Sequence, residues 1–129
     1  TSPELFVRRL VHKMGFRFRL HVRALPGTPD LVFPRLRKVI EVRGCFWHMH
    51  SCRFFKAPAT RRHWWQAKLE GNRARDRRNA LQLKRQGWNL LVVWECQLRP
   101  LQRSQTICRI KKFLAGPDGC TNGPKKSSK

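Results

Sequence analysis

Acidic residues and long apolar runs are what this sequence lacks. Only seven of its 129 residues are Asp or Glu, against 29 Lys and Arg, so the formal net charge is +22. A chain this basic repels itself unless a polyanion neutralises it, and nucleic acid is the natural polyanion. No apolar run approaches the roughly 20 residues that a membrane-spanning helix needs, so we expect a soluble protein with no membrane partner.

The cysteine count and the length limit the architecture. Five cysteines, an odd number, argue against the disulfide framework of a secreted protein, and metal binding in a reducing compartment fits them better. The length suits one domain with a modest core, which we place at residues 1–115. From 116 to 129 glycine, proline, serine and lysine dominate, which predicts a disordered basic tail.

The apolar pattern predicts the order helix, three strands, long helix, strand, helix. The alternating run 16–22 predicts a half-buried strand with His21 on its polar face, and Thr60 can cap the long helix. The run 88–94 is the most apolar in the chain and predicts a central strand. The predicted helices cover 2–14, 61–86 and 101–114, and the predicted strands cover 16–22, 31–33, 39–42 and 88–94.

Two carboxylates stand out because acids are so scarce. Asp30 follows a Pro-Gly-Thr-Pro turn and should begin a strand, while Glu41 lies in the middle of the next strand. If the strands are neighbours, the carboxylates meet and can hold Mg²⁺ against a phosphate, with Arg43 two residues beyond Glu41. Salt bridges to the surrounding arginines are the alternative.

A second cluster of candidate ligands follows at once. Cys45, His48, His50 and Cys52 lie within eight positions, and Cys96 follows a later strand. Thiolate and imidazole ligands favour Zn²⁺. We favour Cys45, His50, Cys52 and Cys96 as a closed structural site, which leaves His48 free, although His48 could replace His50 as the ligand. Buried thiols and exposed histidines without metal are the alternative.

Other polar and aromatic positions allow two interpretations each. Glu4 either complements the dipole of the first helix or lies beside the metal site. Asn72 and Asp76 fall in the middle of the apolar face of the long helix, so they either reach a polar site under it or lie at the margin of that face. The basic residues on the rest of this helix, Arg61 and Arg62 among them, suggest contact with phosphates. The aromatic residues either pack in the core or wedge between base pairs; they are Phe46, Trp47, Trp64 and Trp65.

Several strings together resemble the very short patch repair (Vsr) DNA mismatch endonucleases, from about Pro3 to Leu98. They are Leu25-Pro26-Gly27-Thr28-Pro29-Asp30, the block Gly44-Cys45-Phe46-Trp47-His48, Cys52, the Lys56-x-Pro58 loop followed by Trp65, Asn72 and Arg75-Asp76-Arg77, and Gly87-Trp88 through Val93-Trp94-Glu95-Cys96. Several of these motifs are specific to that family.

The resemblance implies an α/β fold of the restriction-endonuclease-like (PD-(D/E)xK) type, with a mixed central sheet flanked by helices. It implies a Mg²⁺-dependent nick in double-stranded DNA, 5′ to the mismatched thymine of a T:G pair. Such pairs arise when 5-methylcytosine deaminates, and the nick begins their repair. We therefore expect a monomer that works on the nucleoid in the bacterial cytoplasm.

The resemblance also implies roles for single residues. Asp30 resembles the essential metal-binding aspartate, the backbone carbonyl at Val42 helps hold the metal, and His48 resembles the catalytic histidine. Glu4 and Asp76 match acidic positions around that site. The structural zinc ligands of the family are matched by Cys45, His50, Cys52 and Cys96. The aromatic residues that intercalate beside the mismatch are matched by Phe46, Trp47 and Trp65. We expect further DNA contacts at Lys56, Arg61 and Arg62.

Two positions depart from the family pattern. Glu41 stands where the family commonly has an apolar or aromatic residue, and Arg43 where it has Asp or His. Together they recreate the acid-x-cation motif of ordinary restriction nucleases. A restriction-like nuclease without strict mismatch dependence and a zinc-stabilised DNA-binding module that does not cleave are therefore the competing hypotheses. In the family a further segment upstream helps grip DNA, and we expect this sequence to be a fragment.

Overall fold

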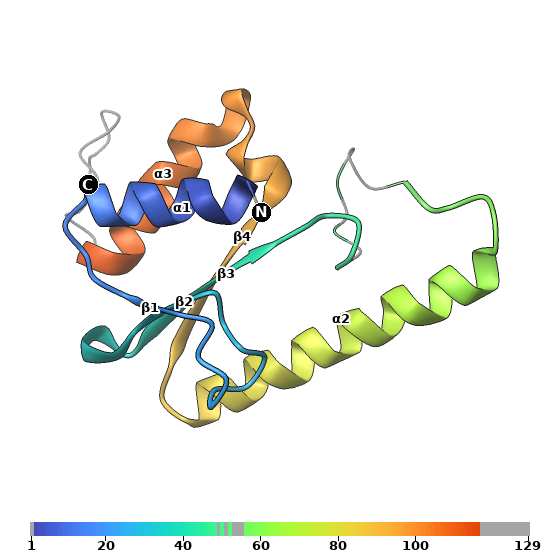
Figure 1. The fold of residues 1–129 in the computed structure, drawn as a ribbon, viewed down its shortest axis with the longest axis horizontal. Helices are drawn as coiled ribbons and strands as arrows, with labels where there is room; N and C mark the ends of the chain where they lie inside the picture. The colour runs from blue at the N-terminus through green and yellow to red at the C-terminus, as the bar shows by residue number, and fades with distance from the viewer. Residues whose placement is uncertain (1, 49, 51, 53–55, 117–129) are drawn as a thin grey trace, which may run out of the picture.

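The computed structural model describes residues 2–48, 50, 52 and 56–116 and shows a mixed sheet between helices (Figure 1). The elements in chain order are α1 (Ser2–Lys13), β1 (Arg19–Leu20), β2 (Leu31–Phe33), the 3₁₀ turn η1 (Pro34–Leu36), β3 (Lys38–Arg43), α2 (Arg62–Arg85), β4 (Asn89–Trp94), the 3₁₀ turn η2 (Glu95–Leu98) and α3 (Pro100–Ala115). The predicted element order is therefore confirmed. Except for Gly116, the predicted tail lies outside the described residues.

The strands follow one another across the sheet in the order β1-β2-β3-β4. The first three are antiparallel neighbours, and β4 returns parallel to β3 after α2 has crossed over. This register pairs Leu31 with Ile40, so the next positions along the two strands, Asp30 and Glu41, lie opposite each other. The expected meeting of the two carboxylates follows directly from this pairing.

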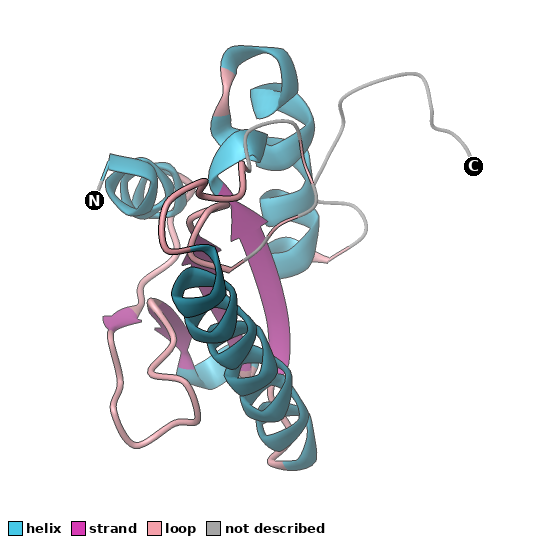
Figure 2. Cartoon of the chain, turned by 90° about the vertical axis from the view of Figure 1, so that its right-hand side faces the viewer, coloured by secondary structure: helices cyan, strands magenta, loops and turns pink. Residues whose placement is uncertain are grey.

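A separate apolar core covers each face of the sheet. On one face α1 and α3 pack together over the strands, through buried residues such as Val7, Ile40 and Ile110. On the other face Leu83 of α2 packs with Val39 and Trp88. Figure 2 shows α2 on its own side of the strands, and Figure 1 shows its first half extending beyond the sheet. Neighbouring strand residues face opposite sides, so Glu41 lies on the α2 face and Ile40 on the other.

Three expectations about single elements need correction. The run 88–94 forms β4 but lies at the edge of the sheet, and Val93 is its one fully buried residue. Helices on both faces explain its apolar composition. The strand expected at 16–22 is two residues long, and His21 directly after it has a left-handed backbone with φ of 48°. At the start of α2, Arg61 is the N-cap residue, and no side chain caps the helix.

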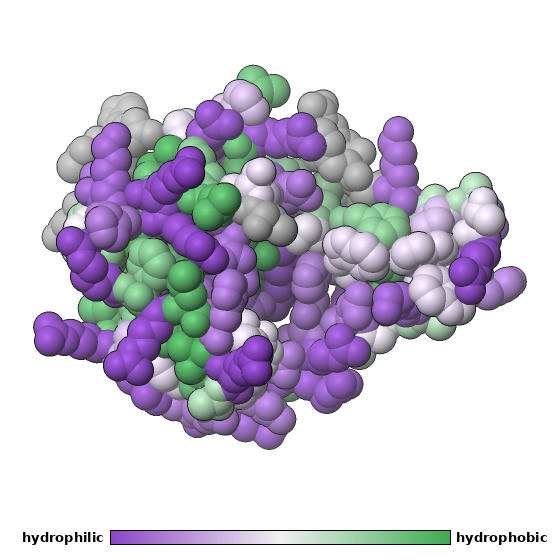
Figure 3. Space-filling view, in the orientation of Figure 1, coloured by the Kyte–Doolittle hydropathy of each residue, from purple (hydrophilic) through white to green (hydrophobic). Residues whose placement is uncertain are grey.

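The surface is strongly basic. Hydrophilic side chains dominate the face seen in Figure 3, including most of that over α2. Only Leu69 and Leu83 of the 24 residues of α2 are buried. No helix in the described part of the chain is both long and apolar enough to cross a membrane.

Candidate active site and metal centre

Six of the residues singled out in the sequence line one small pocket of about 190 Å³, and they include the main catalytic candidates. It lies between the turn before β2, the end of β3, the loop after β3 and the middle of α2. The lining residues are Gly27, Thr28, Asp30, Glu41, Val42, Arg43, His48, Asp76 and Asn79. The pocket thus combines three carboxylates, an imidazole and a guanidinium from segments far apart in the sequence.

Asp30 is held at the junction of β2 and β3. Its Oδ2 accepts a hydrogen bond of 2.7 Å from the backbone N–H of Val42. Burial, together with the neighbouring Glu4 and Glu41, raises the pKa of Asp30 to about 6, against the opposing effect of the Val42 hydrogen bond. A partly buried carboxylate beside two others is a site that a cation would stabilise.

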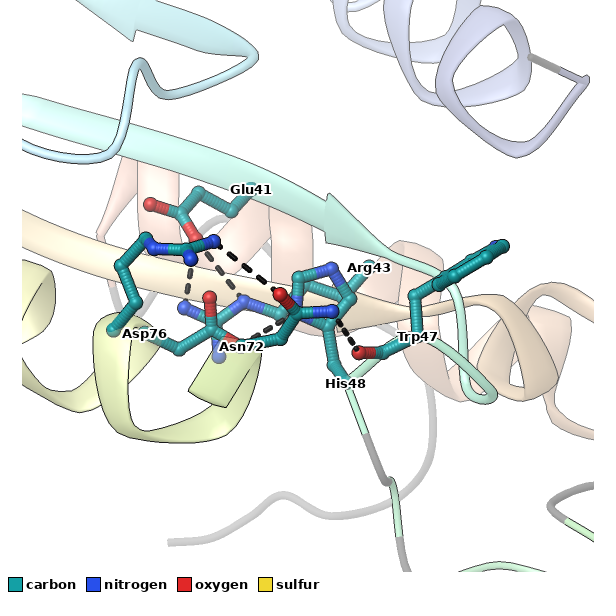
Figure 4. A network of polar contacts seen from close by, with 7 residues as sticks. Glu41, Arg43, Trp47, His48, Asn72 and Asp76 are labelled. Atoms are coloured by element: carbon teal, nitrogen blue, oxygen red, sulfur yellow. Dashed lines mark hydrogen bonds and ion pairs between the residues drawn. The ribbon is translucent and has the colours of Figure 1, made fainter. Parts of the chain in front are cut away.

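His48 and Asp76 form a close pair across the pocket. His48 Nδ1 lies 2.5 Å from Asp76 Oδ2, and the loop after β3 and α2 supply the two partners (Figure 4). A carboxylate at Nδ1 fixes the ring's orientation and leaves Nε2 as the nitrogen that can exchange a proton with another molecule. One turn earlier on α2, the side-chain amide of Asn72 donates to the backbone carbonyl of Trp47 at 3.2 Å. Asp76 therefore lines the pocket under the helix, while Asn72 contacts the backbone of the loop after β3.

Glu41 and Arg43 are paired with each other. Nε and Nη2 of Arg43 donate to Oε1 of Glu41 at 3.0 and 2.7 Å, and both side chains are only 12% exposed. The guanidinium also lies 5.7 Å from the centre of the Trp94 ring. Glu41 therefore makes the arginine salt bridge that was the alternative to metal binding. It still lines the pocket beside Asp30.

Glu4, His21 and Asp30 form a second group on the other side of Asp30. His21 Nε2 lies 2.9 Å from Glu4 Oε2 and 3.6 Å from Asp30 Oδ1. Arg8, one turn along α1, donates to the same Glu4 oxygen at 2.5 Å. Burial disfavours the ionised form of Glu4, but Arg8 and His21 outweigh this and lower its pKa. Glu4 thus lies near Asp30, although it is not among the residues that line the pocket.

The four predicted thiol and imidazole ligands converge. One donor atom from each of them lies within 4.8 Å of the others, an arrangement that could hold a metal ion. His50 Nδ1 is 3.6 Å from Cys45 Sγ and 3.5 Å from Cys96 Sγ, and its ring stacks on Trp94 at 4.0 Å. Burial raises the pKa of Cys45 and raises that of Cys96 to about 12. Burial also lowers the pKa of His50, which favours the neutral imidazole that can bind a metal. The set is completed by Cys52.

The aromatic residues gather beside this centre. The rings of Phe46, Trp47 and Trp65 lie 5.2 to 5.8 Å from one another, and Trp64 meets Trp65 edge to face at 4.9 Å. Trp47 and Trp64 are 48% and 47% exposed, so core packing does not account for them. Arg61 lies 4.6 Å above the Trp64 ring. The predicted DNA contacts Lys56, Arg61 and Arg62 are all exposed.

His21, Asn79 and Trp94 belong to these clusters although the sequence interpretation gave them no role there. A signal for His21 was present. If 16–22 and 31–33 form a hairpin, position 21 lies opposite position 30, as the 3.1 Å hydrogen bond from the His21 N–H to the Asp30 carbonyl demonstrates. Asn79 follows Asp76 by one helical turn, so it shares that face of α2. Nothing local in the sequence indicates that Trp94 stacks on His50.

Comparison with known proteins identifies relatives of the chain. Residues 1–54 match the model of the family described as DNA mismatch endonuclease Vsr. The chain is 52% identical over 101 residues to the type II nicking enzyme V.XorIIP of Xanthomonas oryzae pv. oryzae, covering 78% of this chain and 74% of that protein. It is 46% identical over 99 residues to the DNA mismatch endonuclease Vsr of Escherichia coli, covering 77% and 64%. It is 36% identical over 109 residues to the type II nicking enzyme V.NmeAIP of Neisseria meningitidis, covering 84% and 75%.

Proposed function

The chain belongs to the Vsr DNA mismatch endonuclease family, and on that basis we propose that it nicks one strand of double-stranded DNA 5′ to the mismatched thymine of a T:G pair. The nick would begin the very short patch repair of deaminated 5-methylcytosine, in the bacterial cytoplasm and on the nucleoid, with the enzyme acting as a monomer. One observation carries the proposal: Asp30 and the His48–Asp76 pair line the same pocket, directly beside an exposed aromatic cluster.

The donor chemistry of both clusters suits the expected ions. Three thiols and an imidazole are a usual ligand set of structural zinc. Here Cys45, Cys52 and Cys96 would supply the thiols, and His50 would supply the imidazole. Asp30 offers the hard oxygen ligand that Mg²⁺ prefers, with the Val42 backbone and Glu41 beside it. When bound there, Mg²⁺ would supply positive charge to the scissile phosphate. Mixed-sheet topology with Asp30 opposite Glu41 supports the restriction-endonuclease-like fold.

The protein's own residues account for proton transfer and charge stabilisation. With Asp76 at Nδ1, His48 can accept a proton through Nε2 from a water attacking the phosphate in line, and the carboxylate stabilises the imidazolium that forms. Arg43, held by Glu41, presents a guanidinium at the pocket wall that suits a phosphate oxygen. The aromatic cluster formed by Phe46, Trp47 and Trp65 would wedge into the base stack at the mismatch.

Mismatch selectivity follows from the cost of wedging. Unstacking a base step costs a few kcal/mol, and it costs least at a mispaired base. The aromatic cluster is joined to the catalytic side because Trp47 precedes His48 directly and Asn72 holds the Trp47 carbonyl. An inserted wedge would therefore fix the position of the histidine relative to the strand beside the mismatch.

A restriction-like nuclease without strict mismatch dependence is the second candidate. The Glu41–Arg43 pair favours it, because this pair forms an acid-x-cation motif beside Asp30. Duplexes with and without the mismatch separate the two candidates.

The test is nicking of an end-labelled duplex that carries one T:G pair, beside the matched duplex, each with Mg²⁺ and with chelator. We expect a Mg²⁺-dependent nick on the thymine strand of the mismatched duplex alone. His48→Ala should lose this activity, and His12→Ala, at the far end of α1, should keep it. Equal cleavage of both duplexes would favour the restriction-like candidate. Tight binding of the duplex without any nick would favour a non-cleaving module.

A further inference from the structure

Trp94, the last residue of β4, has contacts in both the predicted zinc centre and the catalytic pocket. Its ring stacks on the ring of His50 at 4.0 Å, with 4° between the two planes. The His48 ring meets the same indole edge to face at 6.2 Å, and the Arg43 guanidinium lies 5.7 Å from the centre of the indole ring. One side chain therefore contacts a predicted metal ligand, the predicted catalytic histidine and the arginine of the pocket wall.

The fold fixes Trp94 in this place from two directions. In the parallel register of β3 and β4, Arg43 pairs with Trp94, so both side chains lie on the α2 face of the sheet, as Glu41 does. The backbone N–H of Trp94 donates to Oε1 of Gln97 at 3.1 Å, and the same oxygen accepts a hydrogen bond of 3.1 Å from Arg109 of α3. The sheet register and α3 together hold Trp94, so its ring is a firm surface for the groups that contact it.

Core packing does not account for the Trp94 side chain. Leu91 and Val93 of the same strand pack with α1 and α3, and Leu90 packs in the core under α2. Trp94 is half-buried, and it is not among the described residues that make up either core. Its ring instead contacts two imidazoles and a guanidinium.

The orientation of His48 needs more than its partner on α2. Within the described part of the chain, its side chain has one hydrogen bond, between Nδ1 and Asp76 Oδ2. A single bond leaves the imidazole free to tilt about it, whereas catalytic groups must be held to within about 0.5 Å. The indole of Trp94 limits this tilt.

The orientation of His50 depends on the same indole. Nδ1 of His50 lies 3.6 Å from Cys45 Sγ and 3.5 Å from Cys96 Sγ, while its ring plane is stacked on Trp94. The stacking holds the plane of the imidazole and so directs Nδ1 toward the thiols. Neighbours that orient a metal-ligating histidine typically change metal affinity or activity by about 10–100-fold.

We propose that Trp94 is a positioning residue that serves both sites: it holds His48 and Arg43 for the nick, and it holds the His50 ring for metal binding. The part of this role that concerns the nick rests on the proposed function. The part that concerns His50 does not, because it needs only the stacked ring and the thiols beside it.

The test compares Trp94→Leu, which removes the ring, with Trp94→Phe, which keeps an aromatic ring at this position. Trp88→Leu is the matched control. It also removes an indole that carries a guanidinium, that of Arg37 at 4.2 Å, but this indole lies in the core under α2. All variants are measured at a temperature at which circular dichroism shows them to be folded.

Two of the readouts need no DNA. Competition with a colorimetric chelator measures zinc affinity, which Trp94→Leu should weaken on the order of tenfold. Carbon-13 relaxation of the His48 ring, in zinc-loaded protein with labelled histidine, measures how firmly the imidazole is held, and Trp94→Leu should cause a loss of order.

The third readout is single-turnover nicking of the T:G duplex. Its rate should fall by about 10–100-fold in Trp94→Leu, while the affinity for the duplex, measured by fluorescence anisotropy, stays unchanged. Trp94→Phe should recover most of each loss, and Trp88→Leu should equal the parent protein in all three readouts.

An unchanged zinc affinity in Trp94→Leu, an unchanged order of its His48 ring or, with an active parent protein, an unchanged nicking rate would each overturn the proposal. Equal losses in Trp94→Leu and Trp88→Leu would overturn it too, because general destabilisation would then explain them. If the parent protein nicks neither duplex, the proposed function fails, whereas zinc affinity and relaxation still decide the role of Trp94.

Discussion

The two clusters that could hold a metal ion differ in the softness of their donor atoms, in burial and in the origin of their residues. The thiol cluster, Cys45, His50, Cys52 and Cys96, takes three ligands from eight consecutive positions, and both Cys45 and Cys96 are buried. The carboxylate cluster, Glu4, His21 and Asp30, takes each ligand from a different segment, and its His21 is exposed. The first has the closed character of a structural site, and the second stays accessible to a ligand.

Their electrostatics differ in the same sense. Burial raises the pKa values of Cys45 and Cys96, so without metal these thiols keep their protons and carry no buried charge. Burial, and after it the neighbouring Glu4 and Glu41, raise the pKa of Asp30 to about 6, so this carboxylate is still ionised at neutral pH. The fold tolerates this unfavourable charge at the carboxylate cluster. We infer that the thiol cluster serves stability and the carboxylate cluster serves chemistry.

We expect the largest effect, a loss of folding stability, from a substitution that disrupts the thiol cluster. Cys96→Ser removes one of four ligands, and structural zinc in small domains contributes about 10–16 kcal/mol to folding. We expect loss of bound zinc and unfolding, or a severely lowered melting temperature, measured by metal analysis and circular dichroism. A chelator should bring the parent protein to the same state. An unchanged zinc content and melting temperature would remove Cys96 from the site.

A substitution in the carboxylate cluster should cause a comparable loss, but of nicking activity and not of stability. Asp30→Ala should reduce nicking by roughly 10³-fold or more, about 4 kcal/mol, because it removes the central carboxylate of the pocket. Binding of mismatched duplex should persist or strengthen, since a negative charge near phosphate is gone. Nicking is measured on an end-labelled T:G duplex and binding by fluorescence anisotropy. A folded variant that no longer binds DNA would count against a metal-binding role.

A smaller effect concerns pH and tests the free-energy cost of the charge on Asp30. Its pKa is about 6 in the folded protein against an ordinary value of 3.8, so the folded state binds the extra proton. This contribution to stability is fully present below pH 3.8 and is lost as the pH rises through 6. Asp30→Asn should therefore be the more stable protein at neutral pH, by up to about 3 kcal/mol, and gain little near pH 4.

Urea unfolding without added Mg²⁺, at pH 4 and at pH 7.5, measures this difference. Glu70→Gln, on an exposed part of α2, is the control. Added Mg²⁺ should reduce the advantage of Asp30→Asn over the parent protein at pH 7.5, because the ion stabilises the ionised carboxylate. An equal difference between parent and variant at both pH values would show that ionisation of Asp30 does not destabilise the folded state.

Much of this site was predictable because the relevant signals are local. The turn before Asp30, the pairing of two short strands and the close spacing of Cys45, His50 and Cys52 each depend on neighbouring residues. The partner of Glu41 was not decided: the same spacing allowed a metal or an arginine, and the structure pairs it with Arg43. Strand register and side-chain direction made that choice.

The sequence by itself determined the element order, the positions of the candidate ligands and the strongly basic surface, since these follow from turn residues, apolar periodicity and composition. Only the tertiary structure decided which distant groups meet. It set β4 at the sheet edge, paired His48 of the loop after β3 with Asp76 of α2, and turned His21 toward Glu4. The physical reason is that these contacts follow from how helices and strands bury their apolar faces against one another, and no short stretch of the chain contains that information.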